Sequence, residues 1–242
     1  FAVPALEETQ KPAFALREPF WFDMFDGDLA ARNKVNGNTM RLADKHGGHS
    51  HRFGGGLGSA HTFNTLCSPD VYFAEHPEYF SEINGRRVKD YTQLCLSNPD
   101  VLRIVTSNVL ERIRKDPGAS FYGVSQNDWY NYCTCPACKA LDEAEESHAG
   151  TMIAFVNKIA EAVEKEFPNV IIETLAYQYT RKPPKTLRPR ANVMPCLCTI
   201  ECDFSFPIPA SAFKENRDFM EDIRGWSAIC KRLYVWDYTT NF

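Results

Sequence analysis

The stretch VIIETLAY at residues 170–177 decides the fold class, because it is apolar at positions that would face both sides of a sheet. Strands with two buried faces occur in parallel sheets that are covered on both sides. Glu173 is the single charged residue in the stretch, and we expect its side chain to point into the interior of the fold. Pro168 and Asn169 end the helical pattern that precedes it. The sequence therefore predicts a buried parallel strand here.

Helical patterns and short apolar runs alternate on both sides of this strand. Apolar residues recur with the helical period from Asn98 to Pro117 and from Ser147 to Phe167. Asn98 and Pro99 form a typical helix start. We expect further helices at 28–35 and 213–229, and further strands at 13–16, 58–63, 119–124, 192–200 and 232–238. Such alternation predicts βα units and a parallel sheet.

Polar residues follow nearly every predicted strand, and their placement favours a closed sheet. In a (β/α)₈ barrel all strands deliver residues to one active face, whereas an open doubly wound sheet does so only near a switch point. The polar groups are Arg17–Glu18, His61, Gln126–Asp128, Tyr177–Tyr179, Glu201–Asp203 and Asp237–Tyr238. We therefore expect an α/β fold of the (β/α)₈ TIM-barrel type. Residues 1–242 would form one catalytic-type domain, with 1–12 as a linker leading into it.

About six or seven strands are expected where a barrel needs about eight, so the barrel is expected to be incomplete at the C-terminus of this chain. The chain also begins with Phe1 rather than Met, which is typical of a processed piece. The last strand and helix of the barrel are therefore expected to lie beyond this chain.

Charge and hydropathy exclude some partners. The net charge is −4 without a basic stripe, which argues against a nucleic-acid partner. The basic, proline-rich segment 181–190 is interpreted as a solvated loop. The sequence has no apolar run of about 18 residues, so no membrane span is expected. Aromatic residues make up 13% of the chain, and the Tyr and Trp among them suit a concave site that stacks on sugars.

Three acids at strand ends are the candidate catalytic groups. Asp128, Glu201 and Asp237 each follow an apolar run and lie near Trp, Tyr or Phe. A pair of carboxylates is the usual apparatus of glycosidic cleavage. Burial against Trp129 would make Asp128 the general acid, with Asp237 or Glu201 as nucleophile or base. The expected substrate-binding residues are Arg17, His61, Gln126, Asn127, Trp129, Tyr177, Gln178, Tyr179, Trp236 and Tyr238.

The cysteines allow three interpretations. Cys133, Cys135 and Cys138 form a CxCxxC motif, and a fourth ligand for zinc could be Cys95 or His148. Disulfides are the alternative in an exported protein, and buried free thiols are the third. Further thiols lie at Cys196, Cys198 and Cys202. No cofactor is required for the expected chemistry, and a structural zinc ion is compatible with it.

Long runs of this sequence resemble a bacterial family called domain of unknown function 4838. They include SQNDWYNYC at 125–133, AYQYTRKPP at 176–184 and RLYVWDYTTNF at 232–242. This family resembles glycoside hydrolase barrels of the α-glucuronidase and β-hexosaminidase types. The resemblance implies an exported bacterial protein with further domains on the same polypeptide and a carbohydrate substrate. Of the Asp-Glu pair in hexosaminidase-like barrels only Asp128 is matched, and Arg17 matches their sugar-gripping arginine.

We therefore expect a glycoside hydrolase that acts on poly- or oligosaccharides. A non-catalytic glycan-binding barrel is the alternative. A zinc-dependent hydrolase that uses His49 and His51, in a glycine-rich loop, is the weaker alternative, because catalytic zinc takes three protein ligands and an open position.

Overall fold

A computed structural model describes residues 7–37, 41–48, 51–55 and 60–238 of the chain. It contains two compact units, Phe1–Arg52 and Phe53–Phe242, which are treated separately below. Within the described residues, none of the helices is both long and apolar enough to cross a bilayer.

The first unit is built from short helices. They are η1 (Phe22–Phe25), α1 (Gly27–Arg32) and η2 (Asp44–His46). Asp26 caps α1 by accepting a hydrogen bond from the backbone N–H of Leu29. A small core forms around Ala30, Val35 and Leu42. The prediction of a helix at 28–35 is confirmed in its first part.

The strand predicted at 13–16 is not formed, so that prediction is wrong. Its carbonyl at Ala15 accepts a hydrogen bond from the side chain of Asn36, and the N–H of Arg17 donates to the same side chain. The run is apolar but finds a side-chain partner instead of a neighbouring strand, and a strand exists only where a second backbone pairs with it.

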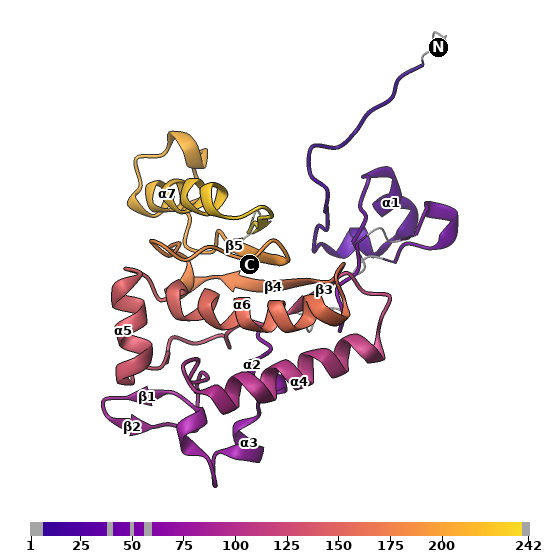
Figure 1. Cartoon of the computed structure of the whole chain (residues 1–242). Helices are drawn as coiled ribbons and strands as arrows, with labels where there is room; N and C mark the ends of the chain where they lie inside the picture. The colour runs from indigo at the N-terminus through magenta and orange to yellow at the C-terminus, as the bar shows by residue number, and fades with distance from the viewer. Residues whose placement is uncertain (1–6, 38–40, 49–50, 56–59, 239–242) are drawn as a thin grey trace. The chain divides into compact units, whose positions relative to one another are not determined.

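The second unit contains a parallel four-stranded sheet in the order β3-β4-β5-β6 (Figure 1). The strands are β3 (Phe121–Gly123), β4 (Ile171–Ala176), β5 (Val193–Cys198) and β6 (Tyr234–Trp236). They pair in register, with Leu175 opposite Cys196 and Cys196 opposite Tyr234. The four strands predicted around these positions are confirmed. Spatial order equals chain order in this sheet.

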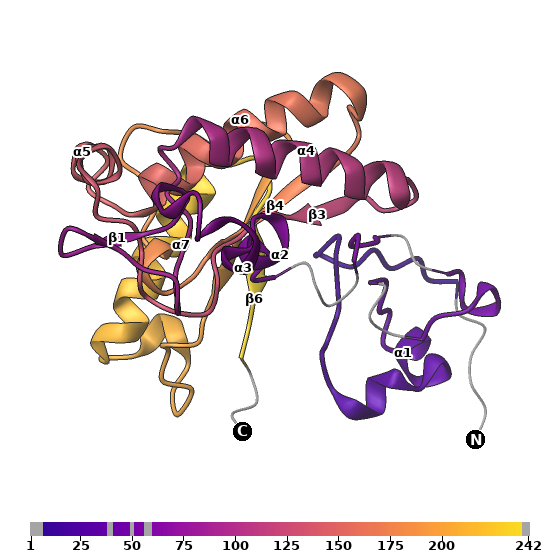
Figure 2. The same ribbon diagram turned by 90° about the horizontal axis from the view of Figure 1, so that it is seen from below.

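Helices connect the strands and cover one face of the sheet. They are α4 (Pro99–Lys115) before β3, α5 (Pro136–Ala144) and α6 (Ala149–Glu166) before β4, and α7 (Lys214–Ile229) before β6. Figure 2 shows α4 and α6 side by side along one side of β3 and β4. Tyr122, Ile172 and Val193 pack in one core cluster with the apolar faces of these two helices.

The helix α7 packs on the same face as α6. Ala176 and Leu197, which are paired across β4 and β5, share a second core cluster with Ile153 of α6 and Trp226 of α7. Side chains alternate along a strand, so residues 172, 174 and 176 of β4 face these helices and residues 171, 173 and 175 face away from them.

The opposite face of the sheet carries a different set of side chains. Leu175, Cys196 and Cys198 cluster there with Ala60 and Trp236. At the other end of this face, the ring of Phe53 lies 5.0 Å from that of Phe121 and 6.2 Å from that of Tyr234. Glu173 belongs to this face, in the middle of β4.

A segment rich in turns precedes α4 in the second unit. It contains α2 (Phe63–Leu66), α3 (Pro69–Tyr72), η4 (Pro77–Tyr79) and the antiparallel pair β1 (Glu82–Ile83) and β2 (Arg86–Arg87). Asn84 and Gly85 join the two strands with positive φ angles of 51° and 74°, as a tight hairpin turn requires.

The strand predicted at 58–63 is wrong for residues 60–63, because Phe63 already begins α2; positions 58 and 59 lie outside the described residues. The helix predicted from Asn98 to Pro117 is confirmed as α4. Asn98 caps α4 by accepting from the N–H groups of Asp100 and Val101, with Pro99 at the first helical position.

Candidate functional site

Polar side chains from neighbouring strands meet at the C-terminal edge of the sheet. Asp128 comes from the loop after β3, Tyr177 directly follows β4, Thr199 follows β5, and Asp237 and Tyr238 follow β6. Because the strands are parallel and adjacent, their C-terminal ends lie along one edge. This is the edge at which α/β proteins bind ligands.

A hydrogen bond joins the ends of β3 and β4. The hydroxyl of Tyr177 donates to Oδ1 of Asp128 across 2.8 Å, and Nε2 of Gln178 donates to the same hydroxyl across 3.0 Å. Asp128 is solvent-exposed. The expected burial of this carboxylate against Trp129 is therefore not found. The surroundings of the carboxylate are the hydroxyl of Tyr177 and solvent.

Burial is the largest cause that raises the pKa of Tyr177, followed by its hydrogen bond to Asp128 and the charge of that carboxylate. Tyr177 therefore keeps its proton over the whole physiological range and donates a hydrogen bond to Asp128. The contact thus holds an accessible carboxylate at the edge of the sheet.

Two residues beside this contact have backbone conformations that are uncommon for side chains other than glycine. His61 has φ of 53° and Gln178 has φ of 52°. Such residues cluster at functional sites, where the surrounding contacts hold them in place. His61 lies with Nδ1 2.9 Å from the carbonyl oxygen of Gln126, and its ring meets that of Tyr177 edge-on at 5.9 Å.

Gln126 and Asn127 are buried and support the loop from within. The amide of Gln126 donates to the carbonyl of Tyr177 and to Oγ1 of Thr180. Asn127 donates to Asn64 and to the carbonyl of Thr92, and its backbone N–H donates to Gln93. Both had been expected to bind substrate, and these contacts give them the role of positioning Asp128.

Trp129 and Tyr179 point to other parts of the second unit. The indole N–H of Trp129 donates to the carbonyl of Thr92, and its ring meets that of Tyr91 edge-on. The ring of Tyr179 lies 5.1 Å from that of Tyr132 and 6.1 Å from that of His148. Tyr179 thereby lines a small cavity that also borders Cys133 and Cys138.

Glu201 takes part in an ion-pair triad that the sequence did not predict. Arg181 lies between two acids, with Nη1 3.1 Å from Oε2 of Glu201 and Nε 2.8 Å from Oδ2 of Asp222. Burial is the largest cause acting on the pKa of Asp222 and raises it, while the charge of Arg181 opposes that shift. The interpretation of 181–190 as a solvated loop is therefore wrong at Arg181, whose side chain is 14% exposed.

Asp237 and Tyr238 complete the edge after β6. Oδ1 of Asp237 accepts a hydrogen bond of 2.9 Å from the hydroxyl of Thr199, which in turn accepts from the N–H of Tyr238. Burial raises the pKa of Tyr238 to about 12, and the charges of Asp128 and Glu201 contribute to the shift. Its ring stacks with Trp236 at 6.4 Å. Tyr238 is thus close enough to respond to acids from two other strand ends.

Glu173 is fully buried on the face that carries Cys196 and Trp236. Burial raises its pKa to about 8, although a hydrogen bond with the thiol of Cys196 acts in the opposite direction. Oε2 of Glu173 has no hydrogen-bond partner among the described residues. The side chain lies on the face of the sheet opposite to the helices, and its raised pKa favours the neutral form of its carboxyl group at neutral pH.

Arg17 belongs to the first unit, where its guanidinium donates to the carbonyl oxygens of Phe14, Ala15 and Lys34. His51 of the same unit lies with Nδ1 3.3 Å from Nδ2 of Asn36. His49, the other histidine of the proposed zinc hydrolase site, lies outside the described residues.

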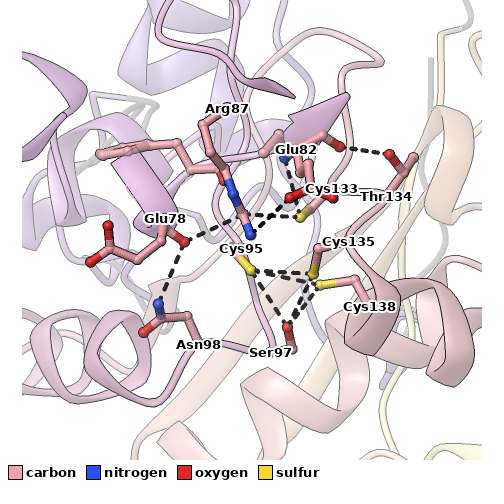
Figure 3. A network of polar contacts seen from close by, with 12 residues as sticks. Glu78, Glu82, Arg87, Cys95, Ser97, Asn98, Cys133, Thr134, Cys135 and Cys138 are labelled. Atoms are coloured by element: carbon pink, nitrogen blue, oxygen red, sulfur yellow. Dashed lines mark hydrogen bonds and ion pairs between the residues drawn. The ribbon is translucent and has the colours of Figure 1, made fainter. Parts of the chain in front are cut away.

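Four cysteines meet in the second unit, on the side where the loop after β3 enters α5 (Figure 3). They are Cys95, Cys133, Cys135 and Cys138, and their Sγ atoms all lie within 4.8 Å of one another. All four are buried, and no disulfide joins them in the structure. His148, the alternative fourth ligand, is engaged elsewhere, with Nδ1 2.7 Å from Oδ2 of Asp142. Cys196 and Cys198, the other cysteines considered as ligands, lie on the face of β5 that is opposite to the helices.

A family model described as Domain of unknown function (DUF4838) matches residues 1–242. The chain belongs to this family. The resemblance noted from the runs around Asp128, Tyr177 and Trp236 is confirmed to that extent. No curated protein matches the chain.

Proposed function

We propose that this member of the DUF4838 family is a carbohydrate-active hydrolase, with its site at the C-terminal edge of the sheet. The observation that carries the proposal is the accessible carboxylate of Asp128, held by the hydroxyl of Tyr177 from the next strand. Aromatic rings at the same edge, Trp236 and Tyr238, offer the flat apolar surface that sugar rings stack on.

The order of the strands supports a barrel as the framework of this site. In an open doubly wound sheet the strand order reverses and helices cover both faces. Here the order is sequential, and α4, α6 and α7 pack on one face. Successive right-handed crossovers on one face are the arrangement that closes into a (β/α)₈ barrel. The four strands form an open sheet, and we propose them as part of such a barrel.

The contacts favour Asp128 and Asp237 as the catalytic pair. Both are exposed and follow the first and last strands of the sheet. Asp128 accepts a hydrogen bond that stabilises its charge, which suits a nucleophile or base better than the general acid expected from the sequence. Asp237 would then donate the proton to the leaving oxygen. Glu201 is paired with Arg181, and we assign it the role of positioning that arginine.

The proposal is tested with a panel of p-nitrophenyl glycosides and with polysaccharides followed by reducing-sugar release. We expect Asp128→Asn and Asp237→Asn to lower kcat/KM by about 10²–10⁴-fold. Asp70→Asn is the matched control, because Asp70 is an exposed acid paired with Lys89. Azide should restore turnover to Asp128→Ala and form a glycosyl azide if Asp128 is the nucleophile.

Two results would contradict this function. Cleavage by Asp128→Asn and Asp237→Asn at the rate of the parent chain would remove the catalytic pair. Glycan binding by the parent chain without cleavage of any substrate in the panel would favour the alternative, a non-catalytic glycan-binding module. Export from the cell, and further domains on the same polypeptide, are proposed from the resemblance to glycoside hydrolases alone.

A further inference from the structure

The four-cysteine cluster joins two distant parts of the second unit. Cys95 lies three residues before the cap of α4, whereas Cys133, Cys135 and Cys138 lie in the loop after β3 and the first turn of α5. The two groups are about 40 residues apart in the sequence, as the 40-residue separation of Cys95 and Cys135 shows. The cluster is thus a tertiary feature that the CxCxxC motif alone does not form.

The distances between the sulfur atoms are those of a tetrahedral metal site. Zinc binds thiolate sulfur at about 2.3 Å, so two ligands at tetrahedral angles lie about 3.8 Å apart. Cys95 Sγ lies 3.7 Å from Cys135 Sγ and 4.0 Å from Cys138 Sγ. A disulfide would require about 2.05 Å. One thiol at comparable distance from two others fits a shared ion better than a pair of disulfides.

Hydrogen-bond donors surround the sulfur atoms, as they do around thiolates (Figure 3). The backbone N–H of Glu82 points at Sγ of Cys133 across 3.4 Å, and Nη1 of Arg87 lies 3.7 Å from the same sulfur. The hydroxyl of Ser97 lies 3.4 Å from Sγ of Cys95 and 3.6 Å from that of Cys135, and it can donate its one proton to either sulfur. Its oxygen accepts from the thiol of Cys138 across 3.2 Å, a contact that could reverse once that sulfur is ionised. Such outer-shell donors orient and tune metal ligands.

The charge of Arg87 also fits a metal centre. Four thiolates around Zn²⁺ carry a net charge of −2, and a partly buried guanidinium beside them offsets part of it. The side chain of Arg87 is 23% exposed and also pairs with Glu82 at 3.4 Å. Its Nη1 also donates to the carbonyl of Phe80 across 2.7 Å, and these contacts hold the cation where thiolate sulfur would be a further anionic partner.

We propose that these four cysteines bind one Zn²⁺ in a closed structural site. Each thiol loses its proton to solvent as its sulfur bonds to the ion. The ion would tie the loop after β3 to the segment that precedes α4. Cys133 is five residues beyond Asp128, so the site would anchor one end of the loop that carries this acid. All four ligands come from the protein, which leaves no open position for catalysis by the metal.

Metal content tests the proposal without reference to any activity. The full chain, purified under reducing conditions without chelator, should contain about one Zn²⁺ per molecule when its metal content is measured by inductively coupled plasma mass spectrometry. Cys95→Ser and Cys138→Ser should lose most of it. Cys230→Ser and Cys67→Ala should retain it, because these cysteines lie outside the cluster.

A second measurement uses the parent chain and does not depend on the folding of a variant. After zinc is removed by a chelator in the presence of reductant, Co²⁺ should bind with the thiolate charge-transfer absorption of a tetrahedral sulfur site. Zinc should then displace it. Disulfide-linked peptides among the four cysteines, or a metal-free parent chain that takes up no Co²⁺, would overturn the proposal.

Discussion

The hydroxyl of Tyr177 donates to the carboxylate of Asp128 across 2.8 Å and connects two strand ends that are 49 residues apart. The contact places an accessible anion where parallel strands end, beside two residues with positive φ, His61 and Gln178. It is therefore the point at which the proposed chemistry can be probed most directly, by changing each partner in turn.

Removing the charge of Asp128 should lower the pKa of Tyr177. The hydrogen bond and the charge of Asp128 both raise that pKa, so Asp128→Asn should shift the tyrosine titration to lower pH. Burial is the largest cause, so the pKa should stay above its ordinary value. The titration is followed by ultraviolet difference absorbance. The part of the absorbance change that is missing in Tyr177→Phe belongs to Tyr177. Asp70→Asn should leave it unchanged, and an unchanged titration in Asp128→Asn would contradict the contact.

Replacing Arg181 should destabilise the second unit. Arg181→Gln leaves the carboxylates of Glu201 and Asp222 without a cation in a largely buried setting, which costs about 3–5 kcal/mol. Denaturant unfolding at pH 7 measures the loss. Burial raises the pKa of Asp222, so this acid can neutralise by protonation and the loss should shrink as the pH falls toward 4. Arg103→Gln is the control, since Arg103 is mostly exposed; equal effects of the two variants would show that the triad contributes nothing.

Glu173 should make stability depend on pH in a defined direction. Its pKa rises from 4.5 to about 8 on folding, so the folded state binds the extra proton between these values. Stability contributed by the neutral carboxyl group is complete below about pH 4.5 and is lost as the pH rises toward 8. Glu173→Gln removes this dependence and should be the more stable form at pH 8, by a few kcal/mol at about 1.4 kcal/mol per pKa unit.

The measurement is the free energy of unfolding of both forms from pH 5 to 9. The parent chain should approach a plateau above pH 8, while Glu173→Gln should vary less across the range. If the two forms lose stability in parallel, another group is responsible for the pH dependence.

The cap of α4 should contribute measurably to stability. Asn98→Ala removes the acceptor for the N–H groups of Asp100 and Val101 and should cost about 1 kcal/mol. Asn98→Asp keeps an acceptor oxygen and should recover most of the loss. Thermal unfolding of the three forms provides the comparison, and a loss of the same size in Asn98→Asp would assign the effect to a contact other than the cap.

Helices α4 and α6 and strands β4 and β5 were predictable from the sequence because their patterns are long and regular. Each helix shows an apolar face with the 3.6-residue period between a start signal and a stop signal. Each strand is a continuous apolar run between turns. The predictions of strands at 13–16 and at 60–63 failed, because a segment of about four residues does not specify a backbone partner.

The residues of the candidate site also fall into two groups, those that the sequence indicated and those that it missed. The sequence placed Asp128, Tyr177 and Asp237 at the ends of strands, and residues that follow parallel strands lie along one edge of the sheet. It missed Arg181, because a cation in a proline-rich segment gives no sign that two acids, 20 and 41 residues away, will enclose it. It also assigned Asn127 to substrate, although the structure surrounds this side chain with internal partners.

The sequence by itself determined which segments become buried strands and amphipathic helices, because that information is carried by local periodicity. Tertiary structure alone decided which side chains meet. Cys95 joins Cys133, Cys135 and Cys138 only through packing of the segment before α4 against the loop after β3, and Asp128 reaches Tyr177 only through pairing of β3 with β4. Contacts between distant segments depend on the whole fold, and no local pattern records them.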